Sequence, residues 1–314
     1  MTSNKPVALV IGASRGIGRQ IAIDLAQKGY AVVVAAKTTS DAYKTIPFPP
    51  EPNSSQSTIN TVEREIRELG GDATAIPVDT RYVDQIHTLM DETVRTYGRL
   101  DVLIYNSGAI WWSSVEDTSV KRFQLMQKVN PEGLYASVQA ALPYFGKNGW
   151  KGRIIVVSPP IYSRFFRGKT AYAMGKVAMS VLTKGLAVDF VRQGRKDMAI
   201  TSIWPACSIE SAATESLTNL EPSTKRDLRK PTIFSDAILA ILEAPAETVN
   251  GLLSIDEDFL RDRGRVTDFR KYSVVPGANP RRIMPAEFPT LEVAEQEDEG
   301  QRVDSTKIYK RAKI

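Results

Sequence analysis

Short runs of apolar, often β-branched residues recur along this chain and alternate with longer segments of helical periodicity. A run of four to eight apolar residues is typical of a strand buried on both faces of a sheet. Such runs lie at residues 7–11, 31–36, 73–78, 101–105, 153–158, 199–204 and 251–255. Because strands that alternate with helices form parallel sheets, this pattern predicts an α/β, Rossmann-type fold with a doubly wound, seven-stranded parallel sheet.

The domain organisation follows from the same pattern. Helices are predicted at residues 17–28, 82–97 and 170–192, and residues 1–260 are expected to form a single domain. The proline-rich segment 40–57 predicts a mobile loop near the adenine end of a cofactor. A polar, helix-containing lid is expected at about 206–235, and residues 261–314 are expected to form a C-terminal extension with a partly disordered tail.

A glycine-rich turn follows the first predicted strand, with the spacing G-x-x-x-G-x-G. Gly12 permits a tight exit from the strand, Gly16 lets the backbone approach a pyrophosphate, and Gly18 lets the next helix pack close to the sheet. The positive end of that helix then faces the ligand. The predicted phosphate-binding residues are Gly12, Ser14, Arg15, Gly16, Ile17 and Gly18. Alone, this pattern also fits an ordinary strand-turn-helix corner.

The second predicted strand ends in a cation where NAD-specific sites usually carry an acid that accepts from the ribose 2′-hydroxyl. Lys37 occupies this position, and Arg15 in the glycine turn is a second cation. Two cations suit a 2′-phosphate, so the pattern favours NADP(H) over NAD(H). Asp79, after the third strand, is expected either to reach the adenine or to cap the helix 82–97.

Small and polar residues follow the fourth and fifth predicted strands. Asn106 and Gly108 follow the fourth strand, and Ser158 ends the fifth. Open α/β sheets bind ligands at the carboxyl edge of their strands, so these residues are expected beside the cofactor. A serine at a strand end is by itself more often structural than catalytic.

Tyr172 and Lys176 lie four residues apart on the predicted helix 170–192. This spacing places them on one helix face, about one turn apart. A free tyrosine has a pKa of about 10, and a nearby ammonium lowers that pKa by favouring the phenolate. The pair therefore predicts a tyrosine that exchanges a proton near neutral pH, while Ser158 binds the substrate oxygen. Such pairs are common on helix surfaces, so the prediction depends on their combination with the glycine turn and Ser158.

Composition excludes several function classes. The chain has one histidine and one cysteine, which argues against a metal site, a Ser-His-Asp hydrolase and an internal disulfide. The net charge is only +5, and no basic helix with interleaved aromatic residues is present, so nucleic-acid binding is disfavoured. No apolar run is long enough for a membrane span.

These motifs together resemble the short-chain dehydrogenase/reductase family over residues 5–256. The resemblance implies that Asn130, in the segment 129–133, holds a water in the proton relay, and that Lys176 also holds the cofactor ribose. It implies further cofactor contacts from the backbone of Ile209 and from Ser211. The implied catalytic residues are Ser158, Tyr172, Lys176 and Asn130. A homo-oligomer, a dimer or tetramer, is also implied by the family.

The sequence departs from the family pattern at three places. Residues 106–109 read Asn-Ser-Gly-Ala in place of Asn-Asn-Ala-Gly, two prolines follow Ser158, and Gly175 replaces a bulkier residue. No reacting group is lost, and the double proline is expected to shape the substrate side. Within the family, the chain resembles the hydroxysteroid dehydrogenase-like subgroup at residues 35–38, 158–160, 206–213 and 272–277. Animal members of this subgroup are peroxisomal and carry a sterol-carrier domain, which we expect this chain to lack.

The last three residues, Ala312, Lys313 and Ile314, are similar to the Ser-Lys-Leu peroxisomal address, from which the final isoleucine departs. With the subgroup resemblance, they predict a peroxisomal protein bound by the import receptor; a cytoplasmic location is the alternative.

The predicted function is NADP(H)-dependent interconversion of a carbonyl and a secondary alcohol on an apolar, acyl- or sterol-like small molecule. Two alternatives stay open. One is reduction of an enoyl thioester, which the same fold can host. The other is a catalytically idle NADP(H)-sensing scaffold, although such proteins usually lose the tyrosine or the lysine that this chain keeps.

Overall fold

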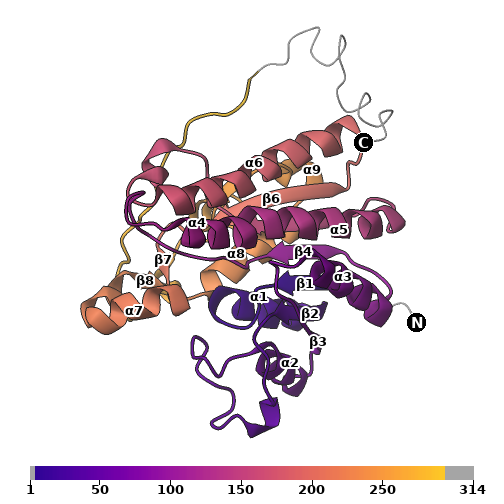
Figure 1. Cartoon of the computed structure of the whole chain (residues 1–314), viewed down its shortest axis with the longest axis horizontal. Helices are drawn as coiled ribbons and strands as arrows, with labels where there is room; N and C mark the ends of the chain where they lie inside the picture. The colour runs from indigo at the N-terminus through magenta and orange to yellow at the C-terminus, as the bar shows by residue number, and fades with distance from the viewer. Residues whose placement is uncertain (1–3, 294–314) are drawn as a thin grey trace.

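A seven-stranded parallel sheet forms the centre of the molecule, in the strand order β3-β2-β1-β4-β5-β6-β9 (Figure 1). The computed structural model describes residues 4–293. The order reverses between β1 and β4, which makes the sheet doubly wound and confirms the predicted fold. The strands are β1 (Val7–Ile11), β2 (Ala31–Ala36), β3 (Asp72–Pro77), β4 (Val102–Tyr105), β5 (Gly152–Val157), β6 (Met198–Trp204) and β9 (Leu253–Ile255).

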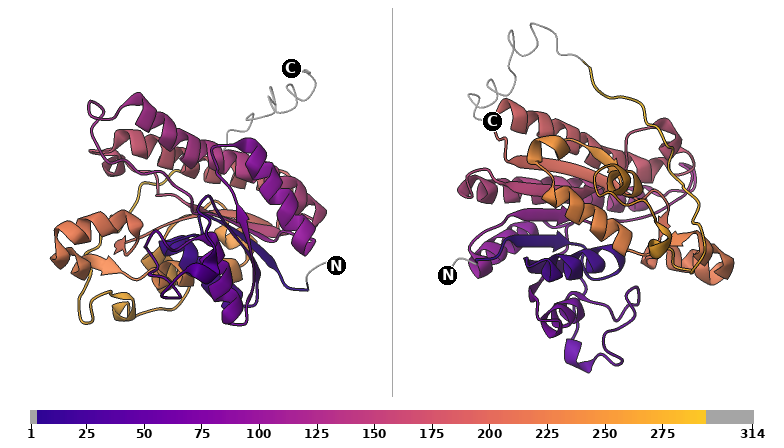
Figure 2. Two further views of the ribbon diagram at one scale, coloured as in Figure 1. Left: turned by 60° about the horizontal axis from the view of Figure 1, so that its bottom comes forward. Right: turned by 180° about the vertical axis from the view of Figure 1, so that it is seen from behind.

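Helices cover both faces of the sheet (Figure 2). Helices α3, α5 and α6 pack on one face, and α1, α2 and α8 pack on the other. The helices are α1 (Gly16–Gln27), α2 (Ile59–Glu68), α3 (Val83–Tyr97), α4 (Val120–Gln127), α5 (Gly133–Lys147), α6 (Thr170–Arg192), α7 (Ala212–Leu220), α8 (Thr232–Glu243), α9 (Ala246–Val249) and α10 (Asp256–Asp262). The three helices predicted at 17–28, 82–97 and 170–192 are confirmed as α1, α3 and α6.

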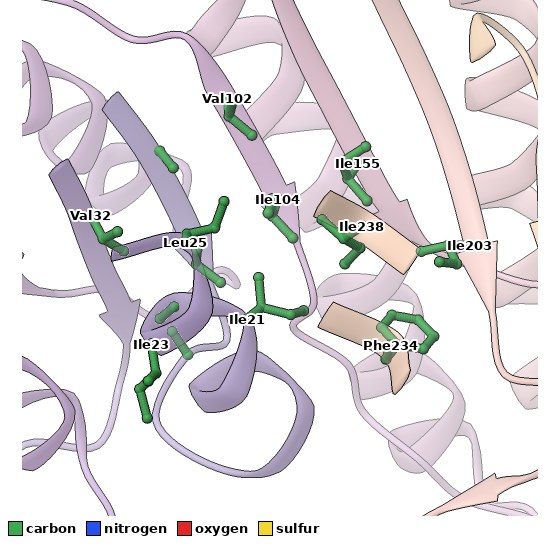
Figure 3. Close-up of a cluster of buried hydrophobic side chains, with 14 of the residues drawn as sticks. Ile21, Ile23, Leu25, Val32, Val102, Ile104, Ile155, Ile203, Phe234 and Ile238 are labelled. Carbon is green, nitrogen blue, oxygen red and sulfur yellow. The ribbon is translucent and has the colours of Figure 1, made fainter. Parts of the chain in front are cut away.

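The strands are apolar throughout because both of their faces are buried. Alternate residues of a strand pack against opposite helical layers. Ile104 of β4 packs on the side of α1, and its neighbour Leu103 packs on the side of α3 and α5. Figure 3 shows Ile21 of α1 and Ile238 of α8 beside Ile104. This packing holds the carboxyl ends of the central strands in place, and the residues of chemical interest follow those ends.

The loop 40–57 is anchored on the glycine turn. The Gly16 N–H donates to the Pro52 carbonyl at 3.1 Å, and the Ser57 hydroxyl donates to the Ser14 carbonyl at 2.8 Å. The loop also contains a short 3₁₀ helix, η1 (Ala42–Lys44). The segment predicted as a mobile loop is therefore tied at its C-terminal end to the predicted phosphate-binding turn.

The segment predicted as a lid contains a second sheet that the sequence did not predict. Two-residue strands β7 (Ser208–Ile209) and β8 (Leu228–Arg229) pair in parallel, with α7 and the 3₁₀ helix η4 (Pro222–Asp227) between them. Strands this short give no periodicity that a sequence pattern can reveal.

The chain beyond α10 folds back onto the domain. Arg282 forms an ion pair with Asp258 of α10 at 2.6 Å, and the side chain of Met284 is buried. Buried Arg229 of β8 forms an ion pair with Glu257 at 2.9 Å and donates to the Ser273 hydroxyl. The predicted peroxisomal signal at 312–314 lies outside the described residues. Within residues 4–293, no helix is both long and apolar enough to cross a bilayer.

Candidate active site

The glycine turn presents the N-terminus of α1 to the carboxyl edge of the sheet. Gly12 and Gly16 have positive φ angles, +90° and +52°, which favour glycine. A Cβ on Gly18 would lie 2.1 Å from the Gly12 carbonyl oxygen, so only glycine fits there. Arg15, which precedes the helix, makes no capping hydrogen bond, and the first turn contains no acid. No side chain caps this helix N-terminus, and although the Gly16 N–H donates to the Pro52 carbonyl, the positive end of the helix is suited to an anion.

A cavity of about 400 Å³ runs along the same edge. It brings together predicted cofactor residues from four different strand ends: Gly12, Ser14, Arg15, Lys37, Asp79, Asn106 and Gly108. Asn106 also ties β4 to the turn, because its side-chain amide donates to the Gly12 carbonyl at 2.9 Å. Gly16, Ile17 and Gly18 continue the turn into α1. Ser211 lies beside the turn, since a Cβ on Gly16 would be 3.4 Å from that of Ser211. Ile209, in β7, is buried in the core cluster on the α1 side and does not line the cavity.

Asp79 is paired with Arg81, a cavity residue that the sequence analysis missed. Its carboxylate accepts from the Arg81 guanidinium at 2.5 to 3.0 Å, and Arg81 holds the pKa of Asp79 below its ordinary value. The alternative role of Asp79 as a helix cap was wrong, because α3 begins after Tyr82 and no side chain caps it. In the sequence, this ion pair could have been inferred from the arginine that stands two residues after the aspartate.

The ribose end of the cavity carries excess positive charge. Arg81 neutralises Asp79, while among residues 4–293 neither Arg15 nor Lys37 forms an ion pair. Both cations line the cavity, and Lys37 is exposed. This balance of charge favours an additional phosphate on a bound ligand.

Lys176 of α6 lies behind the cavity, close to the end of β5 and to the loop that follows β4. Its side chain is 3% exposed, and its Nζ donates to the Val157 carbonyl at 2.9 Å. A Cβ on Gly108 would lie 3.5 Å from this Nζ and 3.6 Å from Oδ1 of Asn130. Gly108, which lines the cavity, therefore lies close to both side chains.

Asn130 lies in a π-helical turn, η2 (Lys128–Glu132), between α4 and α5. Its side-chain oxygen accepts from the Ala109 N–H at 2.8 Å, and its side-chain nitrogen donates to the Ala109 carbonyl at 3.0 Å. The side chain thus fixes the loop after β4. The amide oxygen and nitrogen each keep one further hydrogen-bonding position, and the role of Asn130 in holding a water stays a prediction.

Tyr172 is enclosed by aromatic rings. It is 3% exposed, and the centroids of Trp112 and Phe165 each lie 6.3 Å from its own. Burial raises the pKa of Tyr172 and lowers that of Lys176 to about 7. The expectation that Lys176 lowers the Tyr172 pKa was therefore wrong for the protein alone. A lysine with a pKa of about 7 carries only about half of its charge near pH 7, and desolvation of the phenol dominates.

The aromatic enclosure extends from Tyr172 to the C-terminal extension. Tyr162 packs edge-on against Phe288, with 5.3 Å between centroids, and its hydroxyl contacts the Met284 sulfur at 3.0 Å. Trp112 belongs to this enclosure through its ring contact with Tyr172. Trp111 instead lies under the Arg122 guanidinium, at 4.6 Å. The wall beside the tyrosine is therefore apolar, and residues far apart in the sequence build it.

Ser158 is fully buried at the end of β5, and its hydroxyl meets a second buried serine, Ser180, at 2.9 Å. The sequence analysis missed Ser180. The signal was present, because Ser180 follows Tyr172 and Lys176 at the spacing i, i+4, i+8 on α6.

The depressed pKa of Lys176 predicts a specific dependence of stability on pH. Between about 7 and the ordinary 10.5, the unfolded chain binds a proton that the folded chain does not. The free energy of unfolding therefore rises with pH across this window. Relative to Lys176→Met, the wild type should gain up to roughly 1.4 kcal/mol per pH unit above pH 7. Urea unfolding of both proteins at pH 7, 8 and 9 measures this gain. If the free energy of unfolding changes with pH equally in the wild type and in Lys176→Met, the prediction is wrong.

Comparison with known proteins gives consistent matches. A sequence model described as "short chain dehydrogenase" matches residues 6–47 and 53–220, and the gap falls in the proline-rich loop. The chain is similar to hydroxysteroid dehydrogenase-like protein 2 of Mus musculus, with 33% identity over 270 residues. That match covers 85% of this chain and 51% of the mouse protein, so the chain spans about half the length of this relative.

Two solved structures extend the comparison. A protein from Xanthomonas campestris described as a dehydrogenase shares 33% identity, with a TM-score of 0.75, over 94% of this chain and 100% of that one. A 7α-hydroxysteroid dehydrogenase, solved with NADH and 7-oxo glycochenodeoxycholic acid, shares 26% identity, with a TM-score of 0.65, over 81% and 92% of the two chains.

Proposed function

Because this chain belongs to the short-chain dehydrogenase/reductase family, we propose that it is an NADP(H)-dependent oxidoreductase that interconverts a carbonyl and a secondary alcohol. The observation that carries the proposal is that α6, which bears Tyr172 and Lys176, brings the Lys176 amine to the Val157 carbonyl, next to Ser158, and close to the cavity residue Gly108. The similarity to hydroxysteroid dehydrogenase-like protein 2 agrees with the predicted subgroup.

The cavity fits a nicotinamide dinucleotide. The glycines let the turn close tightly, because a Cβ on Gly12 or Gly18 would collide with the backbone of Ser107 or Gly12. The N-terminus of α1, which no side chain caps, would hold the pyrophosphate. Arg15 and Lys37 would hold a 2′-phosphate, and Lys176 the ribose next to the nicotinamide. A bound nicotinamide supplies the hydride for reduction of a carbonyl, or accepts it from an alcohol.

The chain's own residues then handle the proton. Tyr172 donates its phenolic proton to the substrate oxygen in reduction and takes it back in oxidation. Ser158 hydrogen-bonds the same oxygen and fixes its position. A bound dinucleotide would add negative charge to the cavity, which would favour protonation of Lys176 and so restore the ammonium that stabilises a Tyr172 phenolate. Asn130 holds the loop after β4 that borders this site.

The substrate side favours an apolar molecule. Trp112, Phe165 and Tyr162 provide an aromatic wall beside Tyr172. We propose an acyl- or sterol-like carbonyl compound as the substrate class. The 7α-hydroxysteroid dehydrogenase, solved with a 7-oxo bile acid, is a family neighbour with a substrate of this kind. Subgroup membership also supports a peroxisomal location, for which the signal at 312–314 remains a prediction.

Two alternatives differ in observable chemistry. Reduction of an enoyl thioester saturates a carbon-carbon bond and leaves the thioester carbonyl intact, so product analysis separates it from carbonyl reduction. An idle NADP(H) sensor binds the cofactor and turns over nothing. Purified protein is therefore tested for NADPH consumption with ketones, 3-ketoacyl thioesters and enoyl thioesters. Turnover of ketones or 3-ketoacyl thioesters supports the proposal, and cofactor binding without turnover supports the sensor.

The charge balance at the ribose end predicts a preference for NADPH. We expect kcat/KM to be at least about tenfold higher with NADPH than with NADH, since a charged hydrogen bond contributes roughly 1.5–3 kcal/mol. Lys37→Ala should reduce the value for NADPH about tenfold and leave that for NADH unchanged. Lys28→Ala, which removes an exposed lysine at the far end of α1, is the control. Equal use of both cofactors by the wild type would contradict the assignment.

A further inference from the structure

Helix α6 carries a third polar residue in line with the two proposed catalytic ones. Tyr172, Lys176 and Ser180 follow one another at intervals of four residues, which places them on one face of the helix. This face turns toward the end of β5, where Lys176 donates to the Val157 carbonyl. Ser180 is fully buried there, so its hydroxyl needs partners from the protein.

Those partners are the two residues that follow Val157. The Ser180 hydroxyl lies 2.6 Å from the Pro159 carbonyl oxygen and 2.9 Å from the Ser158 hydroxyl oxygen. A contact to the Lys176 carbonyl, at 3.4 Å, is longer. Ser180 has one proton and two close acceptors, so it donates to only one of them at a time. When it donates to Pro159, the remaining contact is satisfied by the Ser158 hydroxyl donating to Ser180.

The double proline explains why this carbonyl is available. Pro159 and Pro160 have no N–H groups and therefore add no donors after β5. The Ser158 N–H turns back to the Val156 carbonyl at 3.0 Å. Ser158 is thus fixed through its backbone, while its hydroxyl group is held by Ser180 from the helix.

We propose that Ser180 is a positioning residue that holds the Ser158 hydroxyl and sets the direction of its proton. This inference rests on the proposed function, in which Ser158 binds the substrate oxygen. Rotation of the Ser180 hydroxyl between Pro159 and Ser158 gives two arrangements with the same heavy-atom positions. With Ser180 donating to Ser158, the Ser158 proton points to a carbonyl oxygen. With Ser180 donating to Pro159, the Ser158 proton turns to Ser180 and is withdrawn from the substrate oxygen.

The test is a double-mutant cycle on the full-length protein, with NADPH and the best carbonyl substrate of the panel. Ser180→Ala should lower kcat roughly tenfold, because the hydroxyl of Ser158 loses its orientation. KM for NADPH should change less than about twofold, since Ser180 does not line the cofactor cavity. In the Ser158→Ala background, the additional loss from Ser180→Ala should be less than about twofold, because the two residues act as a unit.

Matched variants separate positioning from general damage. Ser137→Ala removes an equally buried serine hydroxyl that bonds only the Gly133 carbonyl of its own helix, α5, and should leave kcat unchanged. Ser180→Cys fills the same place with a weaker hydrogen-bonding group and should give a kcat between those of the wild type and Ser180→Ala. It replaces Ser180→Ala in the test if that variant folds poorly. Thermal shifts on addition of NADPH show that each variant is folded.

Three results would overturn the proposal. The first is unchanged kcat in Ser180→Ala, and the second is an equal loss from Ser180→Ala with and without Ser158. The third is wild-type kcat in Ser158→Ala, which refutes the proposed role of Ser158 and with it that of Ser180. The first two leave Ser158→Ala impaired, so they refute Ser180 alone and leave the proposed function standing.

Discussion

Replacing Tyr172 with phenylalanine is expected to reduce turnover by about 10³-fold while leaving NADPH binding largely intact. General acid-base catalysis contributes about 10²–10⁴-fold, and the two rings that pair with Tyr172, those of Trp112 and Phe165, are not phenols. The phenylalanine ring keeps the packing against Trp112 and Phe165, so the fold should persist. The experiment measures kcat with the carbonyl substrate and, in parallel, the Kd of NADPH by fluorescence titration.

A second buried tyrosine provides the control for this prediction. Tyr97 is buried on α3, and its hydroxyl bonds to Thr74 and Asp72, on the edge strand β3. Tyr97→Phe loses a phenol of similar burial outside the site, so it should alter stability without lowering kcat more than about twofold. If Tyr172→Phe retains turnover near the wild-type level, another group transfers the proton and the proposed mechanism is wrong.

Gly18→Ala is expected to abolish binding of the cofactor, with at least a 100-fold rise in the Kd of NADPH. The new Cβ would lie 2.1 Å from the Gly12 carbonyl oxygen and 2.6 Å from Nδ2 of Asn106. Neither neighbour is free to move, because the Asn106 amide donates to that same carbonyl at 2.9 Å. The helix must therefore move away from the sheet, which displaces the N–H groups that form the phosphate cradle.

The matched control is Gly185→Ala on α6. No heavy atom outside the helix's own local backbone lies within 4 Å of a Cβ at this position, and alanine favours a helix over glycine by about 1 kcal/mol. Gly185→Ala should therefore be neutral or stabilising and bind NADPH normally. Isothermal titration with NADPH, combined with thermal unfolding, distinguishes loss of the cradle from general unfolding. Normal affinity in Gly18→Ala would show that the turn does not form the phosphate site.

The sheet and the cavity were predictable because they depend on short-range patterns. Each central strand is a run of apolar residues, and a strand of this kind has one stable environment, a parallel sheet covered on both faces. Once the strands are known, the residues after their carboxyl ends must share one edge. Lys37, Asn106 and Ser158 were found in this way, although their sequence separations are large.

The ion pair of Asp79 and the pKa of Lys176 could not be predicted, because they depend on which side chains the folded chain brings together. The pairing of Asp79 with Arg81 replaced the predicted helix cap, since a bidentate ion pair was available two residues away. The pKa of Lys176 depends on how completely α6 and the strand ends exclude water from its amine. A spacing of four residues specifies a common helix face and carries no information about that exclusion.

The sequence alone determined the doubly wound parallel sheet and the residue types at its carboxyl edge, because backbone geometry and hydrophobic burial impose those patterns locally. Its motifs also carried the resemblance to the family. Only the tertiary structure revealed the contact of Ser180 with Ser158, and the return of residues 270–284 to the wall beside Tyr162. Both depend on side chains that meet across long sequence separations. Such meetings follow from the packing of whole elements and leave no periodic signal in the chain.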